Sequence, residues 1–348
     1  MKSKFYSLAL AAGMLTLTAC SDDNTNDSNN DKGNGIENGS TLKGTVTEDV
    51  TLKAGNTYKL SGEYIVEAGV TLNIEEGVKI ISVYDNIVDY ILVKQGAKIN
   101  AVGTPDKPIV MTSEKEEPGA WGGIHICGKA HTNAEGGKGS SEIGGAVYGG
   151  NDDADNSGTL QYIRLEYTGF AFDEEHEANG ISFYGVGSGT IVDHCEAYKG
   201  SDDGFEFFGG SVNVSNMVVV SCSDDSFDWT EGWNGKGTDL VAYQEAKATL
   251  GYDCDCLIEA DNNENDNAAT PVSHPVLKTL ILAGNGESKQ GIRLRRGTQA
   301  DIDNAKVCGK GQPLVVESAL TNAALKNGTS KLTNMTVTAA LKSDGDYT

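Results

Sequence analysis

The chain has 348 residues, of which 27 are Lys or Arg and 50 are Asp or Glu, so its formal net charge at pH 7 is -23. This charge disfavours nucleic acid as a partner, and it repels an anionic polymer from most of the surface unless cations or a local basic patch intervene. Neutral glycans, cations or a protein partner fit the composition better.

The first 19 residues have the features of an export signal. A basic start at Lys2 and Lys4 is followed by an apolar stretch at 8–17, which is shorter than the roughly 20 residues that a membrane-spanning helix needs. The tetrapeptide Leu17-Thr18-Ala19-Cys20 resembles the lipobox of bacterial lipoproteins, whose cysteine is acylated after cleavage. The resemblance implies that residues 1–19 are removed and that Cys20 carries a lipid. The alternative is an ordinary secretory signal with a chance cysteine.

Residues 20–42 are expected to form a flexible, lipidated tether. They are rich in Asn, Asp, Ser and Gly and contain almost no apolar residue, so they cannot bury enough surface to fold. Ser21-Asp22-Asp23 resembles the export tag that sends Bacteroidetes lipoproteins to the outer face of the outer membrane. We therefore expect a lipid-anchored protein of the cell outer membrane that faces outside.

Residues 43–348 are expected to form one domain built of short strands. Between residues 58 and 80, apolar and polar residues alternate, and glycines interrupt the pattern at Gly62, Gly69 and Gly77. This pattern is typical of short strands joined by tight turns. No convincing amphipathic helix occurs in the first 300 residues.

The middle of the chain repeats itself at an offset of 22 residues. The segment Ser201-Asp202-Asp203-Gly204-Phe205-Glu206-Phe207 recurs as Ser223-Asp224-Asp225-Ser226-Phe227-Asp228-Trp229. A single coil of this length cannot bury its own apolar face, so it must stack on its neighbours. The repeat therefore predicts an all-β fold, a right-handed parallel β-helix. A β-propeller is disfavoured because its blades need roughly 40 to 50 residues.

The alternation within the repeat assigns a direction to each side chain. Phe205, Phe207, Phe227 and Trp229 are expected to point inward and to form stacked ladders. Glu206 and Asp228 are expected to face outward, where they would be available to a ligand.

Three stretches break the repeat, at 129–157, 170–178 and 231–274. Insertions on a rigid solenoid are common places for binding surfaces, so we expect loops there.

The six cysteines beyond Cys20 are scattered, which favours buried stacking positions over disulfides, although an exported chain permits either. Cys254-Asp255-Cys256 is too tight for the usual zinc knuckle. The six are Cys127, Cys195, Cys222, Cys254, Cys256 and Cys308.

Three features together resemble a family of Bacteroidetes surface lipoproteins with a pectate-lyase-like β-helix, over roughly residues 43–245. They are the run Gly119-Ala120-Trp121-Gly122-Gly123-Ile124, the stretch from Tyr148 to Gly158, and the paired Asp-Asp segments. The resemblance implies an accessory lipoprotein of nutrient uptake, in some members a partner of a starch-utilisation-type, TonB-dependent transporter. It carries no catalytic assignment.

Two groups of acidic residues are candidates for a Ca²⁺ site. Asp202-Asp203 and Asp224-Asp225 would lie one coil apart, about 4.8 Å between equivalent positions, and such a charge density calls for solvent, protonation or a cation. The alternative is that these aspartates only satisfy backbone N–H groups in turns. In the second group, Asp153 and Asp155 alternate with other residues as in half of a calcium loop, although Arg164 at the twelfth position excludes an EF-hand. A plain acidic loop is the alternative there.

The sequence partly supports two enzyme classes, a glycoside hydrolase and a polysaccharide lyase. The segment 201–204 resembles the paired aspartates of polygalacturonase-type hydrolases, but the other motifs of that family are missing. A polysaccharide lyase would need a base near the cation, and Arg293, Arg295 and Arg296 form the only dense basic cluster. The alternative for this cluster is an outward ladder that neutralises Glu206, Asp228 and Glu259.

Trp121 and Trp233 are candidates for stacking on sugar rings, with core packing as the alternative. The function that fits the sequence best is a non-catalytic surface lipoprotein. It would bind a glycan or another nutrient polymer, or dock to a transporter, with a β-helix polysaccharide lyase or glycoside hydrolase as the alternative.

Overall fold

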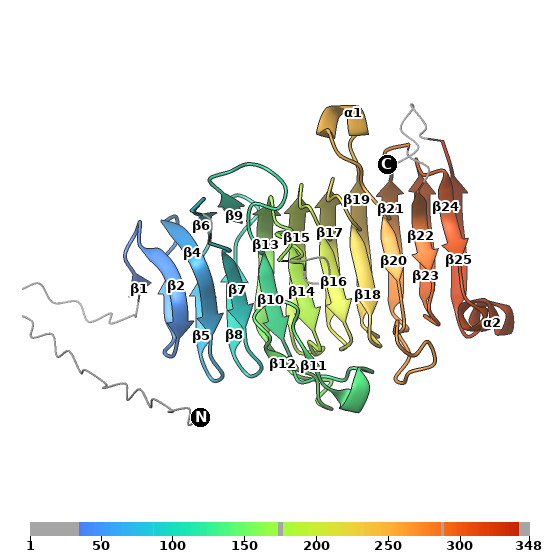
Figure 1. The fold of residues 1–348 in the computed structure, drawn as a ribbon, viewed down its shortest axis with the longest axis horizontal. Helices are drawn as coiled ribbons and strands as arrows, with labels where there is room; N and C mark the ends of the chain where they lie inside the picture. Colours follow the sequence, from blue (N-terminus) through green and yellow to red (C-terminus); the bar gives the residue numbers. More distant parts are fainter. Residues whose placement is uncertain (1–34, 86, 173–176, 287–288, 341–348) are drawn as a thin grey trace, which may run out of the picture. The chain divides into compact units, whose positions relative to one another are not determined.

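The structure is a computed structural model that describes residues 35–85, 87–172, 177–286 and 289–340. Within these ranges, 23 strands form one continuous sheet that winds into a right-handed parallel β-helix, as the repeat predicted (Figure 1). The predicted signal peptide, the lipidated Cys20 and most of the tether lie outside the described residues. The solenoid begins earlier than predicted, because β1 (Gly35–Ile36) lies in the segment assigned to the tether and β2 (Thr41–Val46) starts in it.

The strands stack into three columns that run along the solenoid. The first column starts with the second halves of β2 and β4 (Thr57–Val66) and continues through β7 (Tyr90–Val93), β10 (Ile124–Cys127), β14 (Ile181–Tyr184), β16 (Phe205–Phe208), β18 (Phe227–Thr230), β20 (Ile258–Ala260), β22 (Gln290–Leu294) and β24 (Gln312–Val316). The second column starts with β1, β3 (Val50–Leu52), β5 (Thr71–Ile74) and β8 (Lys98–Val102). The third column starts with the first halves of β2 and β4, followed by β6 (Lys79–Ser82) and β9 (Ile109–Ser113).

From residue 158 onward, one bent strand per coil supplies both the second and the third column. These strands are β13 (Gly158–Glu166), β15 (Ile191–Tyr198), β17 (Asn213–Val220), β19 (Lys236–Tyr243), β21 (Val276–Ala283), β23 (Asp301–Cys308) and β25 (Lys331–Thr338). Each bends at one residue with a φ between 52° and 60°: Tyr162, His194, Asn216, Asp239, Thr279, Asn304 and Asn334. Asn and Asp tolerate this left-handed conformation better than most residues, which explains why they recur at this corner.

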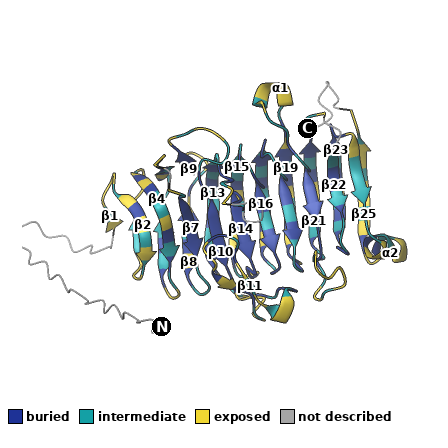
Figure 2. Cartoon of the chain, in the orientation of Figure 1, coloured by how far each residue is buried: buried dark blue, intermediate teal, exposed yellow. Residues whose placement is uncertain are grey.

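The interior of the solenoid is filled by stacked aromatic side chains. Phe205 pairs in parallel register with Phe227, and Phe207 with Trp229; all four are at most 2 % exposed, which confirms the predicted inward ladder. Phe207 also stacks on Trp233, with 4.1 Å between ring centroids. Figure 2 shows that exposed residues gather in the first coils, the helices and the loops, whereas the middle strands are mostly buried.

Of the three predicted loop insertions, the one at 231–274 differs in the structure. The 129–157 insertion carries a short 3-10 helix (Glu135–Gly137) and an antiparallel pair, β11 (Gly139–Ser140) and β12 (Val147–Tyr148). The 231–274 segment is not a single loop, because β19 and β20 are regular strands of the solenoid. One loop, 244–257, carries a four-residue helix, α1 (Lys247–Leu250), and a second loop, 261–275, follows β20. The 170–178 segment connects β13 to β14, and residues 173–176 lie outside the described residues.

A second helix, α2 (Ala319–Asn327), packs beside the last coils. Among the residues that the structure describes, no helix has both the length and the apolar composition needed to cross a bilayer. The six cysteines of the solenoid are all buried as free thiols, which confirms the preference for buried positions over disulfides.

Candidate cation-binding groove

An acidic cavity of about 370 Å³ lies on the outer face of the first column. Ten carboxylates and two arginines line it: Glu142, Glu177, Asp202, Asp203, Glu206, Asp224, Asp225, Asp228, Asp255, Glu259, Arg293 and Arg295. The predicted aspartate pairs of residues 202–203 and 224–225 therefore meet in one site, and so do the predicted ligand-binding residues Glu206 and Asp228.

The parallel register of the first column creates one wall of this site. Because every inward residue of β16 pairs with an inward residue of β18, the outward residues between them also align. Glu206 pairs with Asp228, Asp228 with Glu259, and Glu259 with Arg293. Four consecutive coils thus present a straight row of three carboxylates that ends on a guanidinium.

A second wall comes from the residues just before these strands. The amide N–H of Gly180 donates to the carbonyl of Asp203 at 2.9 Å, and that of Gly204 donates to the carbonyl of Asp225 at 2.9 Å. The amide of Ser226 makes the same bond to the carbonyl of Cys256, at 3.0 Å. Asp255-Cys256 is therefore a third repeat of the Asp-Asp pair, which the sequence analysis missed.

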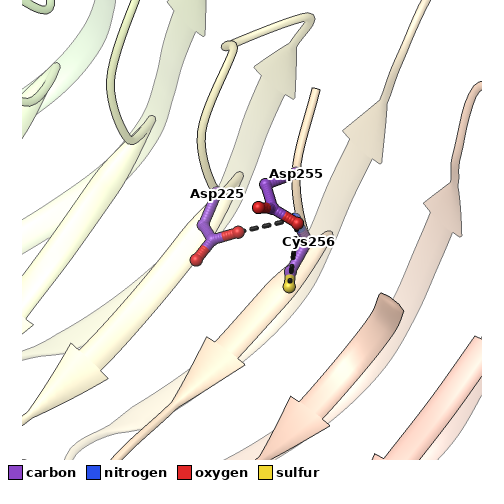
Figure 3. A group of neighbouring side chains, drawn as sticks. All are labelled: Asp225, Asp255 and Cys256. Carbon is purple, nitrogen blue, oxygen red and sulfur yellow. Dashed lines mark hydrogen bonds between the residues drawn. The ribbon is translucent and has the colours of Figure 1, made fainter. Parts of the chain in front are cut away.

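Asp203 and Asp225 each use one carboxylate oxygen to accept a backbone N–H of the next coil. Asp203 Oδ1 accepts the N–H of Asp225 at 2.8 Å, and Asp225 Oδ1 accepts the N–H of Cys256 at 2.6 Å (Figure 3). The alternative that these aspartates satisfy backbone groups is thus correct for one oxygen of each. The second carboxylate oxygen of each residue makes no such backbone bond and is available to a ligand in the cavity.

Positive charge is placed at only one end of the groove. Arg293 Nη1 lies 2.9 Å from Glu259 Oε1, Arg295 Nε lies 2.7 Å from Asp261 Oδ1, and Lys289 Nζ lies 2.8 Å from Asp255 Oδ2. The arginine cluster therefore forms ion pairs with Glu259, as predicted. Arg295 also attracts Asp228 over a longer distance, but the described residues include no ion pair between the cluster and Glu206 or Asp228.

Six carboxylates of the groove form no ion pair with a lysine or arginine among the described residues; they are Asp202, Asp203, Glu206, Asp224, Asp225 and Asp228. Asp202, Asp203 and Asp225 are also at least 93 % buried. Buried carboxylates without compensation are costly in their charged form, so the folded protein must either protonate them or bind cations.

The electrostatics of the groove point in the same direction. Burial raises the pKa of Asp203 well above its usual range, and repulsion from Asp202 and Glu206 adds to this effect. Burial likewise raises the pKa of Asp228, followed by repulsion from Glu259 and Asp261. A bound divalent ion would lower the pKa values of Asp203 and Asp228 again, because it favours the charged carboxylates.

The carboxylate oxygens are close enough to share an ion. Within the described residues, five overlapping groups of three side chains each have one ligand atom within 4.8 Å of the other two. One group joins Asp203, Glu206 and Asp228, and another joins Asp225, Asp228 and Glu259. Asp228 Oδ1 is shielded from solvent and has no hydrogen-bond partner, so the residue that links these two groups has a buried oxygen available for coordination.

The other predicted cation residues lie elsewhere. Asp153 Oδ1 lies 2.7 Å from His131 Nδ1, and Asp155 Oδ2 accepts the N–H of Lys129 at 3.1 Å. Neither aspartate belongs to any of the five groups. Both side chains fasten the 129–157 insertion instead, which agrees with the alternative of an acidic loop.

A second cavity of about 610 Å³ continues the groove and shares Glu142, Glu206, Asp228 and Arg295 with the first. Its remaining lining combines polar side chains with one aromatic ring: Phe208, Thr230, Glu231, Asp261, Asn263, Glu264, Asn265 and Arg296. The two cavities together form a polar groove along the first column.

The 129–157 insertion is fastened beside this groove. Thr132 Oγ1 and Tyr148 OH both donate to Glu231 Oε2 at 2.7 Å, and Asn133 Nδ2 donates to Asn262 Oδ1 at 2.9 Å. The insertion thereby supplies Glu142 to the site, the 170–178 segment supplies Glu177, and the solenoid coils supply the remaining lining residues.

The predicted sugar-stacking role of Trp121 and Trp233 is wrong. Both indoles are 1 % exposed. Trp121 Nε1 donates to the carbonyl of Glu166 at 2.7 Å, and Trp233 Nε1 donates to the carbonyl of Val212 at 3.2 Å. Both belong to the core, as the alternative stated.

The solenoid and its groove define a parallel β-helix protein with an acidic face. A family model described as a pectate-lyase-like β-helix domain matches residues 44–347, and the chain belongs to this family. Neither a curated protein nor a solved structure matches the chain significantly.

Proposed function

We propose that this chain is an exported, lipid-anchored β-helix protein whose groove binds Ca²⁺ and, next to the ion, a glycan. The observation that carries the proposal is the set of six carboxylates in one cavity that form no ion pair with a lysine or arginine among the described residues. No other arrangement in the described part of the chain gathers so many oxygen ligands.

Ca²⁺ fits this arrangement better than Mg²⁺. Calcium accepts six to eight oxygen ligands in flexible geometry, whereas magnesium demands a tight octahedron and keeps much of its water. Carboxylates that repeat along a β-helix offer many oxygens at similar spacing but no preset octahedron. The protein would therefore discriminate between the two ions by coordination number.

A glycan is the ligand class that suits the adjoining cavity. The cavity combines asparagine amides, acidic side chains and the partly buried guanidinium of Arg295 with the ring of Phe208. These amides, carboxylates and guanidinium offer the hydrogen-bond donors and acceptors that sugar hydroxyl groups require. A calcium ion at Asp228 and Glu206, which line both cavities, would add a direct ligand for sugar hydroxyl groups.

A lyase mechanism has little support in the geometry. It requires a residue that takes a proton from the sugar, and a guanidinium must lose its own proton to do so. Although burial lowers it, the pKa of Arg293 is raised by its bonds to Glu317 and Glu259. Arg295 is held by Asp261 and Glu259 in the same way, so both arginines serve as charge partners.

A glycoside hydrolase is the second candidate, because Asp203, Glu206 and Asp228 lie together in one cavity and most enzymes of this class act through a pair of carboxyl groups. Burial raises the pKa of Glu206 well above the usual range, and a carboxylic acid that stays protonated is what a general acid requires. The experiment must therefore measure turnover as well as binding.

The location of the proposed function follows from the N-terminal residues. A lipid on Cys20 followed by an acidic tether would hold the solenoid at the outer membrane, where a glycan is accessible and a TonB-dependent transporter could be a partner. These residues lie outside the described structure and support the proposal through the sequence alone.

The test uses the mature chain with Cys20→Ser, with a panel of neutral and acidic glycans in Ca²⁺ or in chelator. We expect binding that requires Ca²⁺, without new reducing ends or unsaturated products. Asp228→Asn should abolish the binding, whereas Asp193→Asn, which changes an aspartate on the opposite columns, should leave both the binding and its calcium requirement intact. Product formation would replace the binding role by an enzymatic one, and calcium-independent binding that survives Asp228→Asn would refute the proposed site.

A further inference from the structure

The outer face of the third column carries an apolar patch. The parallel register of β15, β17, β19, β21 and β23 aligns one outward residue from each strand; in order these are Glu196, Val218, Val241, Ile281 and Lys306. A second row, two residues further along the strands, adds Val220 and Tyr243. Three central coils thus present five apolar side chains, with a carboxylate on one side of them and an ammonium group on the other.

The five apolar side chains lie outside the core. Side chains alternate between the two faces of a strand, and in β17 and β19 the inward positions are filled by Met217, Val219, Leu240 and Ala242. Tyr243 is 49 % exposed, and the other four residues of the patch are half-buried. A contiguous apolar patch with a polar rim is typical of a contact between proteins.

The charges at the rim are arranged symmetrically about the middle of the patch. Glu196 lies two coils before Val241, and Lys306 lies two coils after it. A two-fold axis along β19 would reverse the order of the coils in a second copy of the chain. Val241 would then face its own counterpart, and each Glu196 would face a Lys306. A surface that is complementary to itself in this way is what a symmetric dimer requires.

Glu196 is placed to take part in such a pair. Arg164 Nη1 lies 2.6 Å from Glu196 Oε1, and the Glu196 side chain is 28 % exposed. The ammonium group of Lys306 from the second copy would approach Oε2 at the rim of the interface. Ion pairs at a rim add little affinity but fix the register of the partners, so they would select the antiparallel arrangement.

We propose that this patch is the interface of a symmetric dimer in which two solenoids lie antiparallel, with third column against third column. A second copy suits the patch because apolar residues then meet apolar residues while both rim charges meet their opposites. The patch and its rim contain fewer residues than the roughly 20 per partner of a standard interface. The dimer should therefore be weak, with a Kd in the micromolar range.

The dimer interface and the acidic groove lie on different faces of the solenoid, since the groove follows the first column. The inference is thus separate from the proposed function. Dimerisation should be equally strong in Ca²⁺ and in chelator.

The test is sedimentation velocity of the mature Cys20→Ser chain over a range of concentrations at physiological ionic strength, where repulsion between two acidic chains is screened. We expect a reversible shift from monomer to dimer. Val241→Glu would place two carboxylates opposite each other at the axis and should weaken the dimer at least tenfold. A chain that stays monomeric at all concentrations would overturn the proposal.

Val110→Glu is the matched control. Val110 lies in the same row, four coils before Val241, whereas the row of the reversed copy ends at Thr336, three coils after Val241. The control should therefore dimerise like wild type. Equal weakening by Val110→Glu and Val241→Glu would refute the assignment to this patch.

A charge exchange tests the antiparallel register. Glu196→Lys and Lys306→Glu should each weaken the dimer, because each brings like charges together at the rim. An equal mixture of the two variants should recover dimerisation, since both rim pairs of the mixed dimer join opposite charges. Failure of the mixture to recover would overturn the antiparallel arrangement, and circular dichroism of each variant establishes that the solenoid has folded.

Discussion

Asp228→Asn should stabilise the metal-free protein at neutral pH and weaken its response to Ca²⁺. The folded-state pKa of Asp228 is raised, first by burial and then by Glu259 and Asp261. A carboxyl group with a raised folded-state pKa contributes stability that is complete below its unfolded pKa of about 3.9 and is lost as the pH rises toward the folded pKa. Metal-free wild-type protein should therefore lose stability as the pH rises.

The size of this effect follows from linkage. Each proton that the folded state retains and the unfolded state has lost costs about 1.4 kcal/mol per pH unit, so Asp228 contributes at most about 3 kcal/mol of destabilisation between pH 5 and pH 7. For a chain of this size that corresponds to roughly 5 °C in Tm. The amide of asparagine does not titrate, so the variant should lack this share of the pH dependence.

The assay is thermal and urea unfolding of wild type and variant between pH 5 and pH 7, in chelator and in Ca²⁺. In chelator the variant should be the more stable protein at pH 7. In saturating Ca²⁺ this difference in stability should shrink or change sign. Asp193→Asn is the matched control. Although burial raises it, the pKa of Asp193 is lowered by hydrogen bonds from Asn216 and Ser215. That change should therefore destabilise the protein at pH 7 by roughly 1 kcal/mol, with or without Ca²⁺. A wild-type stability that is flat with pH in chelator, or a Ca²⁺ response that Asp228→Asn leaves unchanged, would refute the reasoning.

Three further predictions concern separate parts of the chain. Phe207→Ala should lower the free energy of unfolding by roughly 3 to 5 kcal/mol, because the ring stacks on Phe183 at 5.0 Å and on Trp233 at 4.1 Å; urea unfolding measures it, and a loss below about 1 kcal/mol would contradict the buried ladder. Cys20→Ser should move the protein from the membrane fraction to the soluble fraction without lowering its Tm, and continued partition with the outer membrane would count against the lipid anchor. Asp155→Asn should leave the Ca²⁺ dependence of Tm unchanged, because Asp155 binds the Lys129 amide outside the groove; a reduced calcium shift would restore the loop as a site.

The fold was predictable because its repeat is explicit in the sequence. Phe205 and Phe227 occupy the same place in two segments 22 residues apart, and the structure pairs them directly. Once the inward residues are known, the period of two places Glu206 and Asp228 on the outer face. This reasoning requires no knowledge of the loops.

The third repeat escaped prediction because its spacing and its chemistry both change. Asp225 follows Asp203 by 22 residues, but Cys256 follows Asp225 by 31, since the coil between them carries α1 and its flanking loops. A cysteine also replaces the expected aspartate. The signal that remained was the acidic residue at Glu259 between the apolar Ile258 and Ala260, which repeats the pattern of β18.

Other parts of the site depend on contacts between residues that lie far apart in the sequence, which the sequence alone does not reveal. Glu142 reaches the groove only because the 129–157 insertion folds against Glu231, almost 100 residues away. The sequence leaves both tryptophans open to two roles, because aromatic residues beside glycines and polar residues occur both in cores and in sugar sites. Only the packing shows that Trp121 and Trp233 face the interior.

The stacking of the acidic pairs also affects how the solenoid would come apart. In a repeat protein each coil touches only its neighbours, so fraying can begin at an end and proceed one coil at a time. An ion shared between Asp203 and Asp228, or between Asp225 and Glu259, would tie adjacent coils to each other through bonds that must break together. Loading of the groove would thus turn the central coils into a single cooperative block, and an unravelling that starts at α2 would stop where the acidic row begins.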